Sequence, residues 1–218
     1  ERSARVPMVG CAHIDARMGS PGASDNASGT IVLLLLAELL AGYEGGLRIE
    51  LVAMNGEDYF SSPGEQQYLA HNAGRFVDIL LGINVDDVGY RNGRVAYSLY
   101  NCPAVIASVV RAVFASRQGL MEGEPWYQGD HGLFLINQVP ALALTSELLA
   151  ELMGGITHTP RDTPEIIDPG KLVEVAEALR DLVLRLNEMS EDVAQDQPKR
   201  GQGRRCASGP TGENGSVA

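Results

Sequence analysis

The sequence is poor in cysteine and in basic residues, and both shortages exclude classes of function. Its three cysteines, Cys11, Cys102 and Cys206, include no Cys-x-x-Cys pair. Such a scattered, odd set is not a disulfide framework and does not support a zinc site built from thiolates. Lysine and arginine number 17 against 28 acidic residues, which gives a net charge of −11. We therefore expect no nucleic-acid partner, because phosphate binding needs a basic face.

The sequence also lacks a hydrophobic run long enough to cross a membrane. Its longest run, residues 31–40, is interrupted by Glu38. A membrane helix needs about 20 consecutive apolar residues, so we interpret this run as a buried helix and expect no membrane partner. The chain begins Glu-Arg-Ser, with neither a methionine nor a signal-like region. This start is compatible with a processed or truncated product, so the localisation stays open. The sequence does not determine the oligomeric state.

Alternating strands and helices predict an α/β fold. A chain of 218 residues, 44% of them hydrophobic, is long enough for one sizeable core. We expect strands over 6–12, 48–54, 78–85, 94–100 and 141–145, and helices over 27–42, 64–72, 103–117 and from 168 onward. This order predicts a single three-layer α/β/α domain over residues 1–190 with a mostly parallel, twisted sheet, and it is compatible with missing elements before Val6. Residues 191–218 lose the apolar periodicity, so we predict a disordered tail.

Five short polar segments stand where strands or turns are expected to end. They are Ala12-His13-Ile14-Asp15, Ala23-Ser24-Asp25-Asn26, Gly56-Glu57-Asp58, Asn84-Val85-Asp86-Asp87 and Thr157-His158-Thr159. Ligands of open α/β sheets gather beyond the carboxyl ends of the strands, so several of these segments should meet at one edge. Two histidines and several carboxylates suggest a site for two zinc ions. Such a site narrows the chemistry to metal-assisted hydrolysis or a close relative of it.

These segments resemble those of the zinc-dependent peptidases with a paired zinc site, a family that includes leucyl-type aminopeptidases, some carboxypeptidases and glutaminyl cyclases. The matching pieces are Ala-His-Ile-Asp, Pro-Gly-Ala-Ser-Asp-Asn-Ala-Ser-Gly, Asn-Gly-Glu-Asp, Ile-Asn-Val-Asp-Asp-Val-Gly, Gly-Asp-His and Thr-His-Thr-Pro-Arg-Asp-Thr. Each piece is weak alone, but all six occur in the family's order, between residues 8 and 185. His-Glu-x-x-His is absent, so the chain does not resemble the proteases that hold one zinc on a helix. The resemblance implies an aminopeptidase that acts on peptides.

The resemblance also implies a ligand set for the two zinc ions. His13 would bind one ion and His158 the other, and Asp25 would bridge both. Asp58 would complete the shell of one ion and Asp86 that of the other. Imidazole and carboxylate groups suit zinc, and a bridging carboxylate holds two cations about 3.5–4 Å apart.

Other residues would act around the metals without binding them. By the same resemblance, Glu57 would take a proton from the bridging water and pass it to the leaving amine. General-base catalysis of this kind contributes roughly 10²–10⁴-fold. Asp15 lies two residues after His13, on the same side of an extended segment, so it is expected to accept a hydrogen bond from the imidazole ring. Asp130 and His131 match the family's Asp-His segment and are expected near the metals but not on them.

Two positions are less well defined by the pattern. A tyrosine that steadies the substrate carbonyl is often found near the last ligand in the family, but Thr157 stands before His158. Tyr127 is therefore our candidate for oxyanion support. Asp86 and Asp87 compete for one ligand position. The family pattern Asn-x-Asp favours Asp86, and Asp87 is expected to turn to the other face, solvated or paired.

Three alternatives to an aminopeptidase remain. A carboxypeptidase or a glutaminyl cyclase could be built on the same scaffold. In the family, cyclases typically work with one zinc, and this chain keeps both histidines and all the paired-site carboxylates, which favours hydrolysis. The chain could also be a metal-binding module without catalysis, although neither a ligand nor the base is missing.

Overall fold

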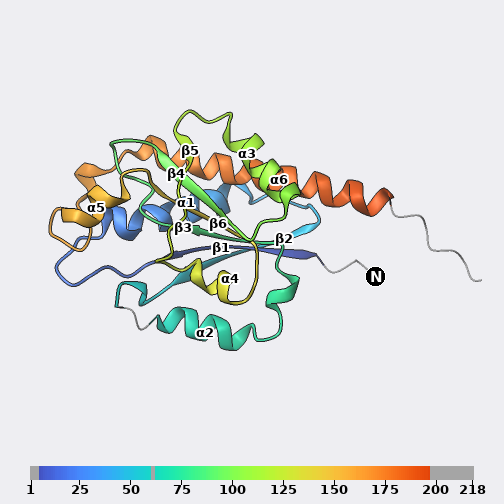
Figure 1. Ribbon diagram of the computed structural model, residues 1–218, viewed down its shortest axis with the longest axis horizontal. Helices are drawn as coiled ribbons and strands as arrows, with labels where there is room; N and C mark the ends of the chain where they lie inside the picture. The colour runs from blue at the N-terminus through green and yellow to red at the C-terminus, as the bar shows by residue number, and fades with distance from the viewer. Residues whose placement is uncertain (1–4, 60–61, 197–218) are drawn as a thin grey trace, which may run out of the picture.

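A six-stranded mixed sheet forms the centre of the computed structural model, which describes residues 5–59 and 62–196 (Figure 1). Its strands are β1 (Val6–His13), β2 (Leu47–Met54), β3 (Leu81–Val85), β4 (Val95–Tyr100), β5 (Leu120–Glu122) and β6 (Ala141–Ser146). They lie in the order β2-β1-β3-β6-β4-β5. Strands β2, β1, β3 and β6 run parallel, and β4 pairs antiparallel with β6. The prediction of a mostly parallel sheet is confirmed.

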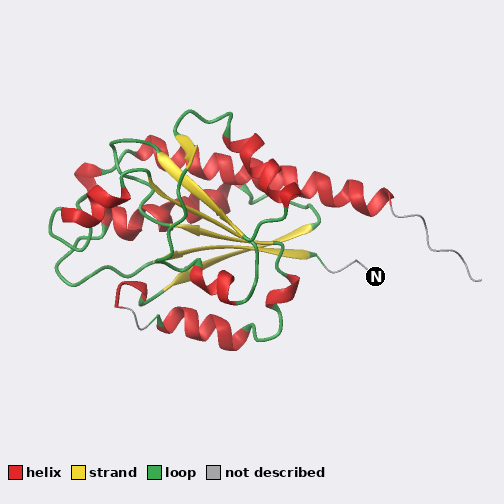
Figure 2. Ribbon diagram, in the orientation of Figure 1, coloured by secondary structure: helices red, strands yellow, loops and turns green. Residues whose placement is uncertain are grey.

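Helices cover both faces of the sheet (Figure 2). They are α1 (Gly29–Leu39), α2 (Pro63–His71), α3 (Ala104–Phe114), α4 (Gly132–Ile136), α5 (Leu149–Gly155) and α6 (Pro169–Asp196). Helices α1, α3 and α6 lie on one face, and α2 and α4 lie on the other (Figure 1). Short irregular turns complete the described chain at Ala23–Ser28, Glu57–Tyr59, Phe76–Asp78 and Pro164–Ile166. The chain therefore has the expected three-layer α/β/α architecture.

The core of the fold has two parts, one on each face of the sheet. The larger part joins the sheet to α1, α3 and α6, and the smaller joins it to α2 and α4. Helix α6 has an apolar stripe at helical spacing, and every residue of it is buried: Leu172, Val175, Ala176, Leu179, Leu182 and Val183. Burying a side chain of leucine or valine size stabilises a fold by about 1.5–3 kcal/mol, so this stripe anchors α6. None of the described helices is long and apolar enough to cross a membrane.

Several element boundaries differ from the predicted ones. Helix α1 begins at Gly29 because Asp25 and Asn26 have non-helical backbone angles inside the preceding turn. Strand β3 begins at Leu81 because Phe76–Asp78 form a 3₁₀ turn. The short elements β5, α4 and α5 were not predicted, since three to seven residues are too few to show a clear period. Helix α6 continues to Asp196, and residues 197–218 of the predicted tail lie outside the described residues.

Candidate metal centre and the pocket beside it

The carboxyl ends of three parallel strands bring predicted ligands to one edge of the sheet. Strand β1 ends at His13, the turn that follows β2 contains Asp58, and Asp86 directly follows β3. The pairing of β1 with β2 and β3 sets these ends side by side. Two further segments approach the same edge. They carry Asp25, in the turn before α1, and His158, in the loop after α5.

Asp25 lies between the two histidines. Its Oδ1 is 3.0 Å from His13 Nε2, and its Oδ2 is 2.9 Å from His158 Nε2. A second carboxylate lies beside each histidine. Asp86 Oδ1 is 3.5 Å from His13 Nε2, and Asp58 Oδ1 is 2.7 Å from His158 Nε2. The five residues therefore form two groups that share the carboxylate of Asp25.

Most of these polar atoms are buried and have no ordinary hydrogen bond. His13 is 1% exposed and Asp58 is 2% exposed. His13 Nε2, both carboxylate oxygens of Asp58 and Oδ1 of Asp86 are buried without a hydrogen-bond partner, although they approach one another closely. Unpaired buried polar atoms are rare and unfavourable, at about 1–3 kcal/mol each. Imidazole nitrogens and carboxylate oxygens that converge in this way fit a metal centre.

The electrostatics of the two groups also favour a cation. Burial by itself would lower the pKa of His13. Its close approaches to Asp25 and Asp86 outweigh that effect and raise the pKa to about 12. For Asp58, burial and then the charge of Asp25 raise the pKa of the carboxyl group above its usual value. The carboxylates thus repel one another, and a bound cation would relieve this repulsion.

Glu57 stands beside these groups without joining them. It precedes Asp58 in the 3₁₀ turn, where adjacent side chains diverge, and it lines the neighbouring pocket. Burial, followed by the charge of Asp86, raises the pKa of Glu57 to about 7. A carboxyl group in this position can exchange a proton with a bound molecule near neutral pH.

Two supporting residues, Asn26 and Asp162, were not singled out from the sequence. Asn26 donates from Nδ2 to the carbonyl oxygen of Val85 over 2.9 Å and accepts from the N–H of Gly29 over 2.9 Å. It thereby joins the turn of Asp25 to the end of β3, next to the predicted ligand Asp86. Close approach explains the glycine, since a Cβ at Gly29 would lie 2.1 Å from the Val85 oxygen.

Asp162 joins the loop of His158 to the turn of Asp25. Its Oδ1 accepts from the N–H of Ser24 over 2.6 Å, and its Oδ2 accepts from the N–H of Asp25 over 3.1 Å. Asp162 is fully buried. Its place in the Thr-His-Thr-Pro-Arg-Asp-Thr segment, four residues after His158, was the signal that could have pointed to it.

Asp15 makes a different contact from the one expected. The His13 Nδ1 atom lies 3.1 Å from the backbone carbonyl oxygen of Asp15 and 3.7 Å from its carboxylate. The carboxylate accepts from the N–H of Gly56 over 2.6 Å instead. The strand ends at His13, so the expected alternation of side chains stops there. Arg17, in the same segment, donates to the carbonyl oxygen of Asp58 and steadies the same turn.

Tyr127 does not line the pocket beside Glu57, whereas the preceding residue, Trp126, does. The side chain of Tyr127 is 76% exposed and packs edge-to-face on Tyr100, with ring centroids 5.9 Å apart. Asp130 and His131 are fully buried next to this segment, and His131 Nε2 donates to the carbonyl oxygen of Trp126 over 2.8 Å. Burial lowers the pKa of His131, which therefore favours its neutral form.

A pocket of about 210 Å³ opens beside the two groups of predicted metal ligands. It is lined by Asp25, Glu57, Asp58, Asp86, Asp87, Trp126, Gln128, Thr145, Leu149, Met153 and His158. The placement expected for Asp87 was wrong. This residue is buried, at 5% exposure, and it faces the same pocket as Asp86. It does so because its backbone takes a left-handed conformation, with φ of 55°, instead of continuing the strand.

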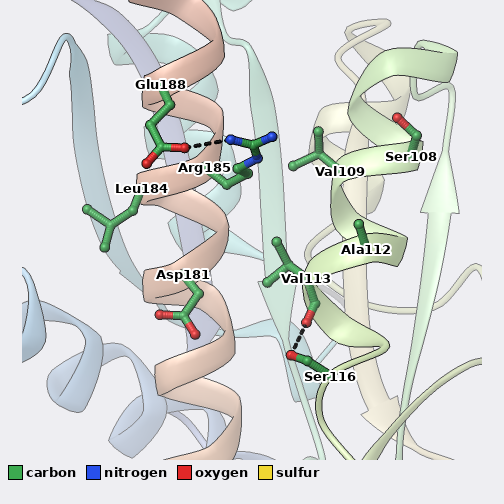
Figure 3. Close-up of a pocket in the computed structure, with 9 residues that line it drawn as sticks. All are labelled: Ser108, Val109, Ala112, Val113, Ser116, Asp181, Leu184, Arg185 and Glu188. Carbon is green, nitrogen blue, oxygen red and sulfur yellow. Dashed lines mark hydrogen bonds and ion pairs between the residues drawn. The ribbon is translucent and has the colours of Figure 1, made fainter.

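A second cavity, of about 670 Å³, lies in the groove between α3 and α6 (Figure 3). Its charged side chains already have partners. Arg185 pairs with Glu188 over 2.7 Å, and Asp181 pairs with Arg117 over 2.5 Å. No histidine lines this groove, so it offers none of the imidazole groups that gather at the sheet edge.

Comparisons with known proteins give a consistent picture. The model of Peptidase family M28 matches residues 1–183. An aminopeptidase from Aneurinibacillus sp. strain AM-1 has 22% sequence identity and a TM-score of 0.73, over 85% of this chain and 44% of its own. A zinc aminopeptidase from Bacillus subtilis has 21% identity and a TM-score of 0.71, over 84% of this chain and 47% of its own.

A glutaminyl cyclase from Porphyromonas gingivalis has 25% identity and a TM-score of 0.64, over 84% of this chain and 73% of its own. The comparison with curated proteins gave no significant match. The chain spans about half the length of the two aminopeptidases. The match to the family model extends over most of the sequence and contains all five predicted metal ligands. The chain therefore belongs to peptidase family M28.

Proposed function

We propose that this chain is a zinc-dependent aminopeptidase that holds two zinc ions. The observation that carries the proposal is the position of Asp25, whose two oxygens lie 3.0 and 2.9 Å from two different histidines. His13 and Asp86 would hold one ion, His158 and Asp58 would hold the other, and Asp25 would bridge them. When bound, such ions act as Lewis acids that lower the pKa of water towards about 7 and polarise a carbonyl group.

The residues of the chain supply the proton transfers and the positioning. Glu57, which belongs to neither metal-ligand group, takes a proton from the attacking water and delivers it to the nitrogen of the leaving amine. Asp162 and Asn26 keep the bridging carboxylate in register with the ends of the strands. The pocket beside Glu57 receives the first residue of the peptide, and its partly apolar walls, Leu149 and Met153, accommodate a side chain.

Substitution of Glu57 tests the mechanism. Glu57→Gln keeps the size of the side chain but cannot accept the proton, so we expect turnover to fall by 10²–10⁴-fold. Zinc content, measured by elemental analysis, should stay near two equivalents. Near-normal activity in this variant would refute the proposed role. Substantially fewer than two equivalents in the folded, zinc-supplied wild-type protein would count against the paired site.

A glutaminyl cyclase is the second candidate. It is favoured by the likeness to the Porphyromonas gingivalis enzyme, because this chain covers 73% of that enzyme but only 44% and 47% of the two aminopeptidases. Three classes of substrate separate the activities: aminoacyl amides, peptides with a free carboxyl terminus, and peptides that begin with glutamine. Release of free amino acids from the amides supports the aminopeptidase. Cyclisation with loss of ammonia supports the cyclase, and release from the carboxyl end supports a carboxypeptidase. Zinc binding without turnover of any substrate would indicate a metal-binding module.

A further inference from the structure

Asp87 is a buried acid in the pocket that the proposed reaction does not use. It is 5% exposed, and its Oδ1 has no hydrogen-bond partner. Its carboxylate lies within 4.8 Å of the carboxylates of Asp25 and Asp86. Its left-handed backbone conformation, with φ of 55°, turns the residue towards the pocket instead of continuing the strand.

Thr145 is a second polar residue without a partner in the same pocket. It lies near the end of β6, is 4% exposed, and its hydroxyl group makes no hydrogen bond. The N–H of Asp86 donates to the carbonyl oxygen of Leu144 over 3.0 Å, so the chain around Thr145 runs alongside Asp86 and Asp87. The pocket therefore offers two hydrogen-bond acceptors from neighbouring segments. Its described lining contains neither lysine nor arginine.

The chemistry of these atoms selects a ligand with several N–H donors and a positive charge. A primary ammonium group has three donors and no acceptor, so it complements a carboxylate and a hydroxyl oxygen. Distance selects which ammonium group this is. In a peptide, the amino nitrogen is only about 2.5 Å from the carbonyl carbon of the same residue. Because Asp87 lies so close to Asp25 and Asp86, it can reach an α-ammonium group more readily than the far end of a long side chain.

We propose that Asp87, assisted by Thr145, binds the α-ammonium group of the first residue of the peptide and thereby restricts cleavage to the amino-terminal bond. This inference rests on the proposed function and specifies how the site would recognise its substrate. The first side chain would then extend along Leu149 and Met153. Asp87 acts in binding and not as a metal ligand, so the two roles can be separated by experiment.

The test compares two ligands that differ only in the amino group. L-leucine hydroxamate carries it, and 4-methylpentanoyl hydroxamate lacks it. Their dissociation constants are measured by calorimetry on the zinc-loaded full chain. We expect the wild-type protein to prefer the amine by about 10–100-fold, since hydrogen bonds to charged groups are worth that much in affinity. Asp87→Asn should reduce the preference to a few-fold and leave the affinity for the des-amino ligand unchanged.

Two further variants and the zinc content complete the design. Thr145→Val replaces the unpaired hydroxyl with a group of similar shape and should lower the preference several-fold in a folded protein. Asp78→Asn changes an exposed carboxylate away from the pocket and should leave both dissociation constants unchanged. Zinc content should be the same in all four proteins.

Three outcomes would overturn the inference. The wild-type protein could show no preference for the amine, Asp87→Asn could keep the full preference, or Asp87→Asn could lose zinc, which would make Asp87 a metal ligand. Neither measurement needs turnover. A protein that binds zinc and selects the amine but hydrolyses no peptide would refute the proposed activity and leave this inference intact.

Discussion

The carboxylate of Asp162 ties the loop of His158 to the turn of Asp25, and its removal should therefore affect both stability and metal binding. In Asp162→Ala, the backbone N–H groups of Ser24 and Asp25 lose their acceptors, which lie 2.6 and 3.1 Å away. Hydrogen bonds to a charged group contribute about 1.5–3 kcal/mol each, so two of them give roughly 3–6 kcal/mol. Burial raises the pKa of Asp162 despite these donors, which shows that desolvation offsets part of the gain. We therefore expect a loss of about 3–4 kcal/mol in the free energy of unfolding.

This loss should be measurable by urea denaturation of protein that has been stripped of metal with a chelator. In thermal denaturation of the same metal-free protein, 1 kcal/mol corresponds to about 2–4 °C in Tm for a chain of this size, so Tm should fall by roughly 10 °C. Zinc affinity, measured by competition with a chromogenic chelator, should fall by about 10–100-fold, as for other residues that hold ligands in place. The second effect follows because Asp25 would no longer be fixed between His13 and His158.

Asp168→Ala is the matched control. Asp168 also accepts a hydrogen bond from a backbone N–H, that of Gly170, over 2.9 Å, but it lies at the start of α6 and away from the site. Loss of a cap of this kind costs about 1 kcal/mol and should leave zinc affinity unchanged. If Asp162→Ala were no less stable than the control and bound zinc normally, Asp162 would not be the anchor described here.

Three other predictions concern separate parts of the fold and the site. Gly29→Ala should destabilise the protein by roughly 3 kcal/mol or more in urea denaturation, because the new Cβ would lie 2.1 Å from the Val85 carbonyl oxygen, and a wild-type midpoint would contradict this close contact. Burial raises the pKa of Asp130 from 3.8 to about 8, so between these two pH values the carboxyl group is protonated in the folded state and ionised in the unfolded state. The stability of the chelator-treated protein should then fall as pH rises between these values, by up to about 1.4 kcal/mol per pH unit, and Asp130→Asn should remove that slope. Tyr127→Phe should leave kcat within about twofold, because the side chain is exposed and outside the pocket. Removal of an oxyanion donor typically lowers kcat by 10²–10³-fold, and a fall of that size would support Tyr127 as the group that stabilises the substrate carbonyl.

The short-range patterns of the sequence were informative where one segment determines its own environment. The apolar stripe of α6 was located because its buried residues repeat with the period of a helix. The strands β1, β2 and β6 were located to within a few residues as short apolar runs, and β1 and β6 are buried almost without interruption. Segments of three to seven residues, such as β5 and α4, escaped detection since they contain too few turns or alternations. The change at Asp87 escaped it for another reason, because a single left-handed residue reverses the expected direction of a side chain without altering the pattern around it.

The sequence by itself determined which residue types are available, in what order, and that several of them follow strands. From this it predicted an α/β fold and the family to which the chain belongs. Only the tertiary structure decided which atoms meet. It placed the imidazole ring of His13 against the backbone carbonyl oxygen of Asp15, while the carboxylate of Asp15 accepts a hydrogen bond from the N–H of Gly56. It also joined Asp162 to Ser24, which lies 138 residues away in the sequence. The physical reason is that a hydrogen bond tolerates only a few tenths of an ångström of variation in the distance between donor and acceptor. That distance is set by packing between segments that are far apart in the sequence.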